Sequence, residues 1–211
     1  MIRPALGLVI TATAAMLAFS SAAAPAPSAP AGAYVMDLSH TSVTFRVDHL
    51  GLSHYTGRFI RATGTLAFDP ANPKAQSVTA TIDATSLQTN YPDPLKLNFD
   101  AQVQKQFLDV AKNPQITFKS TKVDLTGPQT AKVTGDLTLH GATKPVVLET
   151  TFNAGYPKGG PDPSGARIGF SAHGVFKRSD FGMANFIPAP GTHFGIGDEI
   201  EVIIETEFTM K

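Results

Sequence analysis

The segment VDHLGLSHYTGRF, residues 47–59, gathers the side chains with the clearest potential for chemistry in this sequence. His49 and His54 stand five residues apart, next to Asp48, Ser53 and Tyr55. An imidazole can bind a metal ion or accept a proton near neutral pH. A catalytic zinc site needs about three protein ligands that converge on one point. Two histidines alone therefore do not make a metal site.

A third ligand for this pair would have to come from elsewhere in the chain. His40 and His193 are candidates, but no spacing supports either. His49 is in phase with the apolar residues before it, so we expect it to point inward at a strand end and to bond to a backbone carbonyl. His54 is expected in the turn after Gly51. We predict no metal site and keep an exported enzyme that uses His49 and His54, with or without a metal, as the alternative.

Nucleophilic catalysis has equally little support. Ser53 is adjacent to His54, but adjacency in sequence does not orient a base toward a hydroxyl group. The signatures GxSxG, GxGxxG, HExxH and the P-loop are absent. Asp100 and Asp109 fit charges on a helix surface better than an acid/base pair. We therefore predict no catalytic residue and a protein that is not an enzyme.

Arg178 and Asp180 lie in the segment RSDFG, between a predicted strand and a Phe-rich connection. They could hold this connection in place through an ion pair, or contact the polar head of a ligand. The structural role is the one that we favour.

The elements that must position these residues are strands. Apolar and polar residues alternate in four segments, as expected for strands with one dry face and one wet face: 42–49, 77–84, 132–141 and 199–210. Four further segments fit this pattern less regularly: 58–69, 115–125, 144–153 and 167–177.

Two of the irregular segments contain specific anomalies. In 115–125 the apolar parity changes between Ser120 and Lys122, which predicts a β-bulge. In 58–69 the parity of the other apolar residues leaves Phe59 on the opposite face, and its place stays open.

Two connections are long. Residues 95–114 carry apolar residues at helical spacing up to Asn113-Pro114, which predicts a helical stretch over one end of the sheet. Residues 178–198 are rich in Gly, Phe and Pro and are expected to form part of a rim. The predicted fold is all-β, an eight-stranded antiparallel barrel with a helical insertion between strands three and four; a sandwich would bury the same apolar faces.

The first 23 residues consist of a start with one basic residue, a short apolar stretch and small residues before an expected cleavage site. This order is typical of a secretory signal peptide. Residues 24–33 are rich in Pro and Ala and predict a tether. Without the leader the charged residues number 16 basic and 17 acidic, because the leader removes only Arg3 from 17 of each. This balance does not favour a nucleic-acid partner. The chain has no cysteine, so core packing must stabilise it.

The segments together resemble the YceI-like family of bacterial secreted proteins over roughly residues 34–210. The resemblance rests on six blocks in the right order: DLSHTSVTFRVDHLGLS (37–53), GRF (57–59), GTLAFD (64–69), FLDVAKNPQITFKS (107–120), VTGDLTLHGATKPV (133–146) and RSDFGM (178–183). The resemblance implies a lipocalin-like barrel, over residues 34–211, that holds a polyisoprenoid or similar amphiphile, such as an isoprenoid quinone, and has no established catalysis. It also implies a periplasmic or secreted protein that acts in transport, storage or stress protection.

The inward positions of the predicted strands, with His49 and the loop residue Phe181, are the candidate ligand-binding residues. They are Phe45, Val47, His49, Phe68, Ile82, Phe118, Leu137, Phe170, Phe176, Phe181 and Val202. The same side chains would also fill a closed core, and the residues alone leave the two interpretations about even; the resemblance favours a ligand. A solid barrel would instead suit a protein-interaction module.

The expected partner is thus a hydrophobic small molecule, with no further cofactor. Transient contact with a membrane would fit such a ligand. The sequence leaves the oligomeric state, the ligand and its donor and acceptor open.

Overall fold

The computed structural model describes residues 29–159 and 165–210. The predicted signal peptide, residues 1–23, lies outside the described residues and stays a prediction. Of the predicted tether, residues 29–33 are described: Ala29 is buried, and Gly32 and Ala33 already belong to the first strand. Among the described residues, the helices are too short or too polar to cross a bilayer.

The described residues form ten strands and five short helical elements. In order they are β1 (Gly32–His49), β2 (Ser53–Phe59), β3 (Ala62–Phe68), η1 (Pro73–Ala75), β4 (Ser77–Asp83), η2 (Ala84–Ser86), β5 (Leu87–Gln88), α1 (Phe99–Val103), η3 (Gln104–Leu108), β6 (Gln115–Leu125), β7 (Thr130–Leu139), β8 (Ala142–Tyr156), β9 (Arg167–Lys177), η4 (Arg178–Phe181) and β10 (Ile196–Met210).

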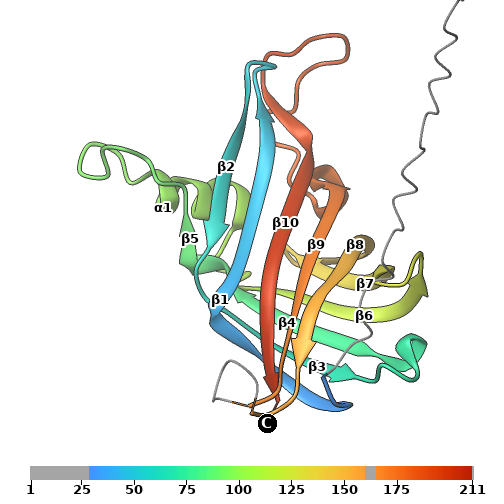
Figure 1. The fold of residues 1–211 in the computed structure, drawn as a ribbon. Coiled ribbons are helices and arrows are strands. Elements are labelled where there is room, and N and C mark those ends of the chain that lie inside the picture. Colours follow the sequence, from blue (N-terminus) through green and yellow to red (C-terminus); the bar gives the residue numbers. More distant parts are fainter. Residues whose placement is uncertain (1–28, 160–164, 211) are drawn as a thin grey trace, which may run out of the picture.

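Eight of these strands close into an antiparallel barrel, which confirms the predicted fold (Figure 1). The strand order is β10-β9-β8-β7-β6-β4-β3-β1, and β1 closes the sheet by pairing with β10. The lower part of β1, Gly32–Val35, pairs with β3, and its upper part, Val43–His49, pairs with β2. The β1–β2 hairpin therefore rises above the barrel wall, and β5 adds a short pair at the base of β2.

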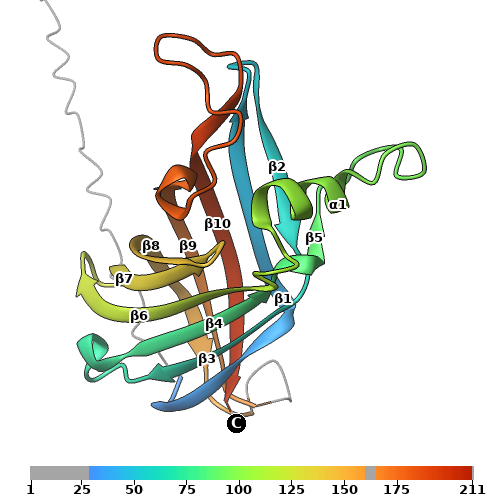
Figure 2. The same ribbon diagram turned by 180° about the vertical axis from the view of Figure 1, so that it is seen from behind.

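Three expectations about the elements need correction. The strand expected at 58–69 is two strands, because the chain leaves the sheet at Ile60 and Arg61 between β2 and β3. The strand expected at 42–49 begins at Gly32, before a register shift between Asp37 and Ser42. The helical stretch expected over 95–114 is confined to α1 and the π-helical turn η3, which lie beside β2 and β5 (Figure 2).

The bulge expected between Ser120 and Lys122 is confirmed, because the pairing of β6 with β7 shifts register between these residues. The hydroxyl oxygen of Ser120 also accepts a hydrogen bond from the backbone N–H of Val78, at 2.9 Å. The bulge thus turns the apolar face of β6 inward on both of its sides, with Phe118 before it and Val123 after it.

Two clusters of buried side chains lie in the barrel, and the space between them is described below. One cluster contains Tyr34, Leu66, Phe68, Ile168 and Phe208, which come from β1, β3, β9 and β10. The other contains Ile116, Leu137, Leu139, Val146, Phe181 and Met183, with Phe59 and Phe176 packed against it. Phe59, which the sequence left unplaced, thus lies on the inward side of β2.

A close approach inside the barrel explains one glycine. A Cβ on Gly135 would lie 2.3 Å from Cζ of Phe118 and 2.7 Å from the carbonyl oxygen of Lys119. Only glycine therefore leaves room for the Phe118 ring to lie across β7. Gly169 on β9 has no such neighbour, since the nearest atom to its Cβ position is 3.9 Å away.

We expect Gly135→Ala to lower the free energy of unfolding by roughly 1–3 kcal/mol, because the backbone or the Phe118 ring must move. Gly169→Ala is the matched control in another barrel strand and should change stability by less than about 0.5 kcal/mol. Urea unfolding followed by circular dichroism measures both. Equal stability of the two variants would mean that Phe118 does not need this space.

Candidate functional site

The barrel encloses one large cavity among the described residues, with a volume of about 860 Å³. Side chains from all eight barrel strands line it, together with side chains from β2, α1, η3 and the connection before β10. Most of them are aliphatic or aromatic. A volume of this size is within the range of about 300–1,000 Å³ that small-molecule sites occupy.

All predicted ligand-binding residues except Phe181 line this cavity. They are Phe45, Val47, His49, Phe68, Ile82, Phe118, Leu137, Phe170, Phe176 and Val202. The period-two pattern therefore identified the inner face of the barrel correctly. Whether these residues contact a ligand stays a prediction.

Phe181 lies behind the cavity wall instead. It is only 1% exposed, and its ring packs edge-to-face against Phe176 with centroids 5.3 Å apart. It belongs to the η4 turn, to which the strand pattern does not extend. Phe181 therefore supports a lining residue and is not itself part of the lining.

The sequence did not single out a further group of lining residues. They come from β2, the residue after β5, α1, η3, the last loop and the start of β10: Tyr55, Phe59, Thr89, Phe99, Gln102, Gln106, Phe107, Leu108, Phe186 and Ile196. The helical spacing of Phe99, Val103 and Phe107 led us to expect a helical stretch over one end of the sheet, but we did not count these residues among the ligand-binding candidates. Tyr55 had been considered only as part of a catalytic cluster.

His49 and His54 do not form a joint site. His49 pairs with Ser53 across the β1–β2 hairpin, and Asp48 pairs with His54. Because paired residues share a face and neighbours in a strand alternate, the two imidazoles lie on opposite faces. His49 lines the cavity, and His54 is exposed in β2 rather than in the turn as expected.

The proposed third ligands do not complete the pair. His40 lies nine residues before His49 in β1, which at about 3.3 Å per residue is roughly 25–30 Å away. His193 packs against the β1–β2 turn: a Cβ on Gly51 would lie 3.1 Å from its Cβ. The geometry therefore gives no support to an enzyme built on His49 and His54.

Arg178 has the structural role that we favoured, although not through an ion pair with Asp180. It is 2% exposed and donates from Nε to the carbonyl of Gly197 and from Nη2 to the carbonyl of Ile196, both at 2.8 Å. Nη1 donates to the carbonyl of Met183. Burial lowers the pKa of Arg178. The side chain thus fastens both ends of the last loop while one side of it faces the cavity.

Asp100 and Asp109 each make a structural contact, and the two contacts are separate. Asp100 accepts two hydrogen bonds from Thr89, from its backbone N–H at 2.8 Å and from its hydroxyl at 2.5 Å. Asp109 caps the end of η3 in a left-handed conformation and pairs with Lys112. Asp100 therefore fixes α1 to the end of β5, and through it a part of the cavity wall.

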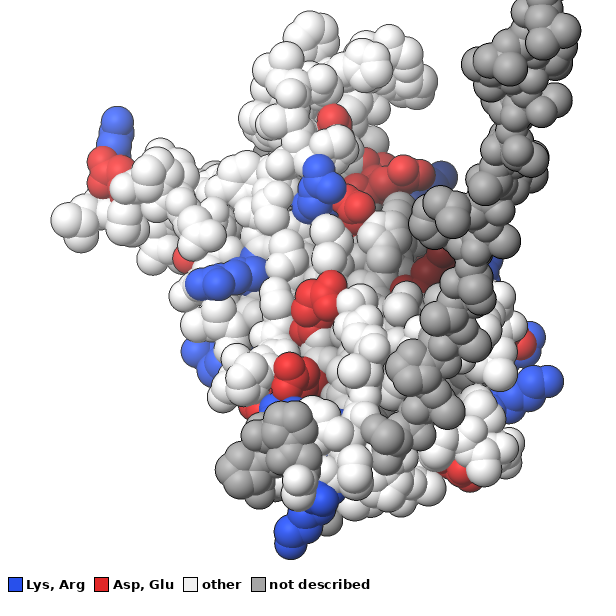
Figure 3. All heavy atoms as spheres, in the orientation of Figure 1, with Lys and Arg blue, Asp and Glu red and all other residues white. Residues whose placement is uncertain are grey.

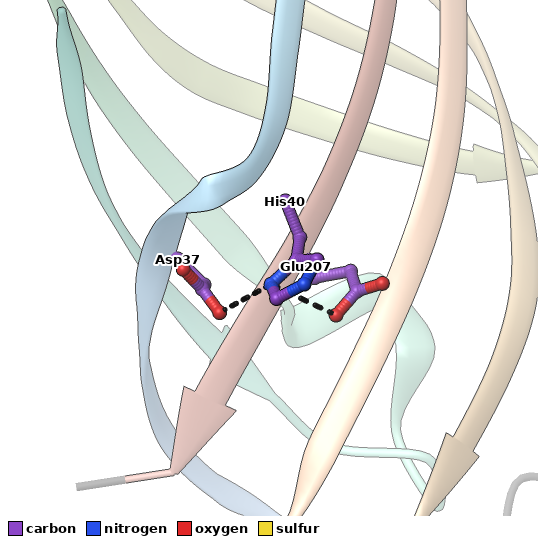
Figure 4. Close-up of side chains that lie close together, drawn as sticks. All are labelled: Asp37, His40 and Glu207. Carbon is purple, nitrogen blue, oxygen red and sulfur yellow. Dashed lines mark hydrogen bonds and ion pairs between the residues drawn. The ribbon is translucent and has the colours of Figure 1, made fainter.

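One group of side chains has the composition of a metal site: Asp37, His40 and Glu207, on the outer face beside the β1 bulge (Figure 4). Arg167 already lies between the carboxylates, since its Nη1 donates to Asp37 at 2.6 Å and to Glu207 at 2.7 Å. His40 Nδ1 is 2.9 Å from Asp37. The arrangement is an ion-pair network that fastens the bulge of β1 to β9 and β10.

This network shifts two pKa values in opposite directions. Hydrogen bonds from His40 and Arg167 hold the pKa of Asp37 far below its usual range. The hydrogen bond to Asp37, with the charge of Glu207, raises the pKa of His40.

The fold and the cavity define a class of protein: a hollow antiparallel barrel with an apolar interior of ligand size. The chain belongs to the YceI-like family, whose domain model matches residues 34–208. It is 42% identical over 173 residues to a UPF0312 protein of Pseudomonas savastanoi pv. phaseolicola, covering 80% of this chain and 85% of the relative. It is 40% identical over 195 residues to protein YceI of Escherichia coli O157:H7, covering 90% and 94%.

Solved structures share the fold. BcnA of Burkholderia cenocepacia superposes with a TM-score of 0.67 at 24% identity, covering 82% of this chain and 98% of that one. The YceI protein of Campylobacter jejuni gives 0.62 at 30% identity, covering 78% and 90%. A polyisoprenoid-binding domain from Saccharophagus degradans gives 0.62 at 13% identity, covering 84% and 98%.

The ion-pair network predicts how stability depends on pH. Asp37 stabilises the fold above its unfolded pKa of about 3.9, and this contribution is lost as pH falls further. The contribution of His40 is complete below about pH 6.5 and is lost as pH rises through its raised folded pKa. Asp37→Asn should therefore cost most between about pH 4 and 6.5, roughly 1–3 kcal/mol, and less at pH 3.

Urea unfolding at pH 3, 5.5 and 8 measures this dependence. Asp124→Asn is the control, because Asp124 pairs with Lys122 on an exposed part of β6, and its effect should stay below about 0.5 kcal/mol. A stability difference for Asp37→Asn that is the same at all three pH values would show that the network does not titrate as described.

Proposed function

We propose that this protein binds a polyisoprenoid or a similar long amphiphile, an isoprenoid quinone among them, inside the barrel. The main support for this proposal is the apolar cavity of about 860 Å³, which takes the place of a solid core. We further propose that the protein is exported to the periplasm or beyond and acts there in transport, storage or protection of its ligand, without catalysis.

The physical chemistry of such a ligand favours a carrier. Each methylene group that leaves water for an apolar environment gains about 0.8 kcal/mol, so a long prenyl chain cannot circulate free in an aqueous compartment. A bilayer offers the chain nearly the same environment as the cavity does. Transfer between membrane and lumen is then close to balanced, which allows both loading and release.

One group of polar side chains in the lining lies at the end of the cavity formed by the β1–β2 hairpin and α1, and it suits a polar head group; other polar residues, such as Gln76 and Gln129, line the opposite end. His49 and Tyr55 come from the β1–β2 hairpin, and Gln102 and Gln106 from α1 and η3. Phe45 and Phe59 lie just below them, with ring centroids 6.0 Å apart. A ligand with its head among the polar groups would place its chain among the aromatic and aliphatic residues deeper in the barrel.

Family membership supports this proposal. The structure from Saccharophagus degradans is described as a polyisoprenoid-binding domain, and it shares this fold. A protein-interaction module with a solid barrel, the other possibility left by the sequence, is at odds with the cavity.

Native mass spectrometry of protein purified without denaturation should show a hydrophobic molecule bound with one-to-one stoichiometry. Protein stripped of it should take up a long-chain polyprenol or an isoprenoid quinone from ethanol. A clean unliganded mass together with no uptake of either compound would contradict the proposal.

Filling the lumen should abolish binding. Ala80 lies on the inner face of β4 opposite Phe118, so Ala80→Trp would place an indole where the ligand chain lies. Thr79→Trp, on the exposed outer face of the same strand, is the matched control. We expect Ala80→Trp to weaken polyprenol binding by at least about tenfold, because a few methylene contacts are lost, and Thr79→Trp to leave it unchanged. Unaltered binding by a folded Ala80→Trp protein would place the ligand outside the lumen.

A further inference from the structure

Two segments form the end of the barrel that rises above the wall: the β1–β2 turn, residues 50–52, and the loop before β10, residues 184–195. They are joined by a hydrogen bond from the backbone N–H of Leu50 to the carbonyl of Gly195 at 2.9 Å. A second bond, from the N–H of Ile196 to the carbonyl of Phe186 at 2.7 Å, closes the base of the loop. The two segments therefore form one surface.

Large apolar side chains cover this surface, which we call the apolar tip. It consists of Leu50, Leu52, Phe186 and Phe194, and the last three are 82%, 63% and 87% exposed. An exposed group of this kind on a protein surface generally marks a contact with another molecule or with a membrane.

The apolar tip is continuous with the cavity. Leu50 and Phe186 line the cavity and are also exposed to solvent. Both have a left-handed backbone conformation, with φ of 61° and 62°, which is costly for large side chains without a polar group. The chain thus holds two apolar side chains at the lip of the lumen in a conformation that glycine or asparagine would adopt more easily.

Charged residues are scarce at this end of the molecule: Asp48, whose carboxylate accepts a hydrogen bond from the backbone N–H of Gly51 at 3.0 Å, stands at the base of the turn. Residues 49–57 and 181–197 contain no Asp, Glu, Lys or Arg. On the face shown in Figure 3 the top of the molecule is white, with one red residue just below it, whereas most blue and red atoms are spread over the body. The cavity also reaches the hairpins at 69–76 and 126–130, where Asp69, Lys74 and the Lys122–Asp124 ion pair stand close by.

We propose that the apolar tip docks on the surface of a lipid bilayer, so that the lumen opens toward the acyl chains. This inference rests on the proposed function, because a ligand that avoids water must enter from an apolar phase. A bilayer fits this end better than a charged protein partner does, since docking there desolvates no Asp, Glu, Lys or Arg side chain of these two segments. Insertion of Leu52 and Phe194 would bring the bilayer interior close to the cavity lip at Leu50 and Phe186.

The two segments of the apolar tip have no Lys or Arg, and this specifies what kind of membrane binding to expect. Proteins that dock by electrostatic attraction need anionic lipids and bind less tightly as salt increases. Docking through the apolar tip should instead occur on vesicles of phosphatidylcholine alone and should change little between about 50 and 500 mM salt.

The test is co-sedimentation of the full chain with phosphatidylcholine vesicles. Leu52→Glu combined with Phe194→Glu is the informative variant, because neither residue lines the cavity or belongs to a buried cluster. Leu95→Glu combined with Leu97→Glu is the matched control: these two exposed leucines lie in the segment before α1 and do not line the cavity. We expect the tip variant to bind vesicles at least about tenfold more weakly and the control variant to bind like the unaltered protein.

Loading from ethanol with a long-chain polyprenol, read by native mass spectrometry, separates this inference from the proposed function. If all three proteins take up polyprenol and only the tip variant loses vesicle binding, the inference stands. Vesicle binding that is lacking in the unaltered protein, or equal in the tip variant, overturns it. If light scattering shows a dimer that only the tip variant loses, with no vesicle binding, the surface belongs to a second copy of the chain. Tip-dependent vesicle binding without polyprenol uptake would overturn the proposed function and leave the docking surface in place.

Discussion

The pairing of β1 with β10 is the interaction on which the rest of this structure depends. It runs from Tyr34 opposite Met210 to His49 opposite Ile196 and joins the two ends of the sheet. Without it the apolar faces of the strands would border on water at two open edges, and the cavity would have no wall on that side. The network of Asp37, Arg167 and Glu207 strengthens this seam at the point where the bulge of β1 interrupts the pairing.

A closed sheet of eight strands sets the size of the interior, and the side chains decide how much of it is filled. Here the buried residues gather in two clusters, and a hollow remains between them. An unfilled apolar space forgoes dispersion contacts that a solid core would make. A ligand that supplies those contacts would bind the folded state alone and thereby stabilise it. The cavity thus lowers the packing density of the protein on its own and leaves room for a ligand.

Alternation along the strands was enough to predict the barrel and most of its inner face, because burial on one side only imposes a period of two. It failed where the chain changes face. Tyr34 and Met36 point inward from even positions, whereas Val43, Phe45 and Val47 do so from odd ones, and the bulge between Asp37 and Ser42 joins the two parts. The start of β1 therefore could not be read from the pattern of its second half. Phe59 was unplaced for a related reason, since Ile60 and Arg61 separate two strands that looked like one.

The period of two along strands does not predict where loop residues lie or which residues meet across long sequence distances. Phe186 reaches the cavity through a loop conformation, and Arg167 meets Asp37 across 130 positions of sequence. His49 and His54 were grouped because they are close in sequence, yet a hairpin puts its cross-strand neighbours on one face and separates residues of opposite parity. Sequence proximity thus suggested a catalytic pair that the fold divides, and sequence distance concealed the ion-pair network that the fold assembles.

The two ends of the lumen differ in a way that bears on how a ligand would move through it. Around the hairpins at 69–76 and 126–130 the surface carries charged residues, and an apolar chain that left there would pass from the lumen directly into water. At the other end the lip itself is apolar and uncharged, and His49, Tyr55, Gln102 and Gln106 lie at the cavity wall nearby. An amphiphile that enters or leaves through this end can keep its chain in an apolar environment throughout, and its head group can exchange one set of polar partners for another. The free-energy cost of transfer then falls only on the step in which the head group crosses the lip. At that step the protein's own side chains can control the rate of transfer.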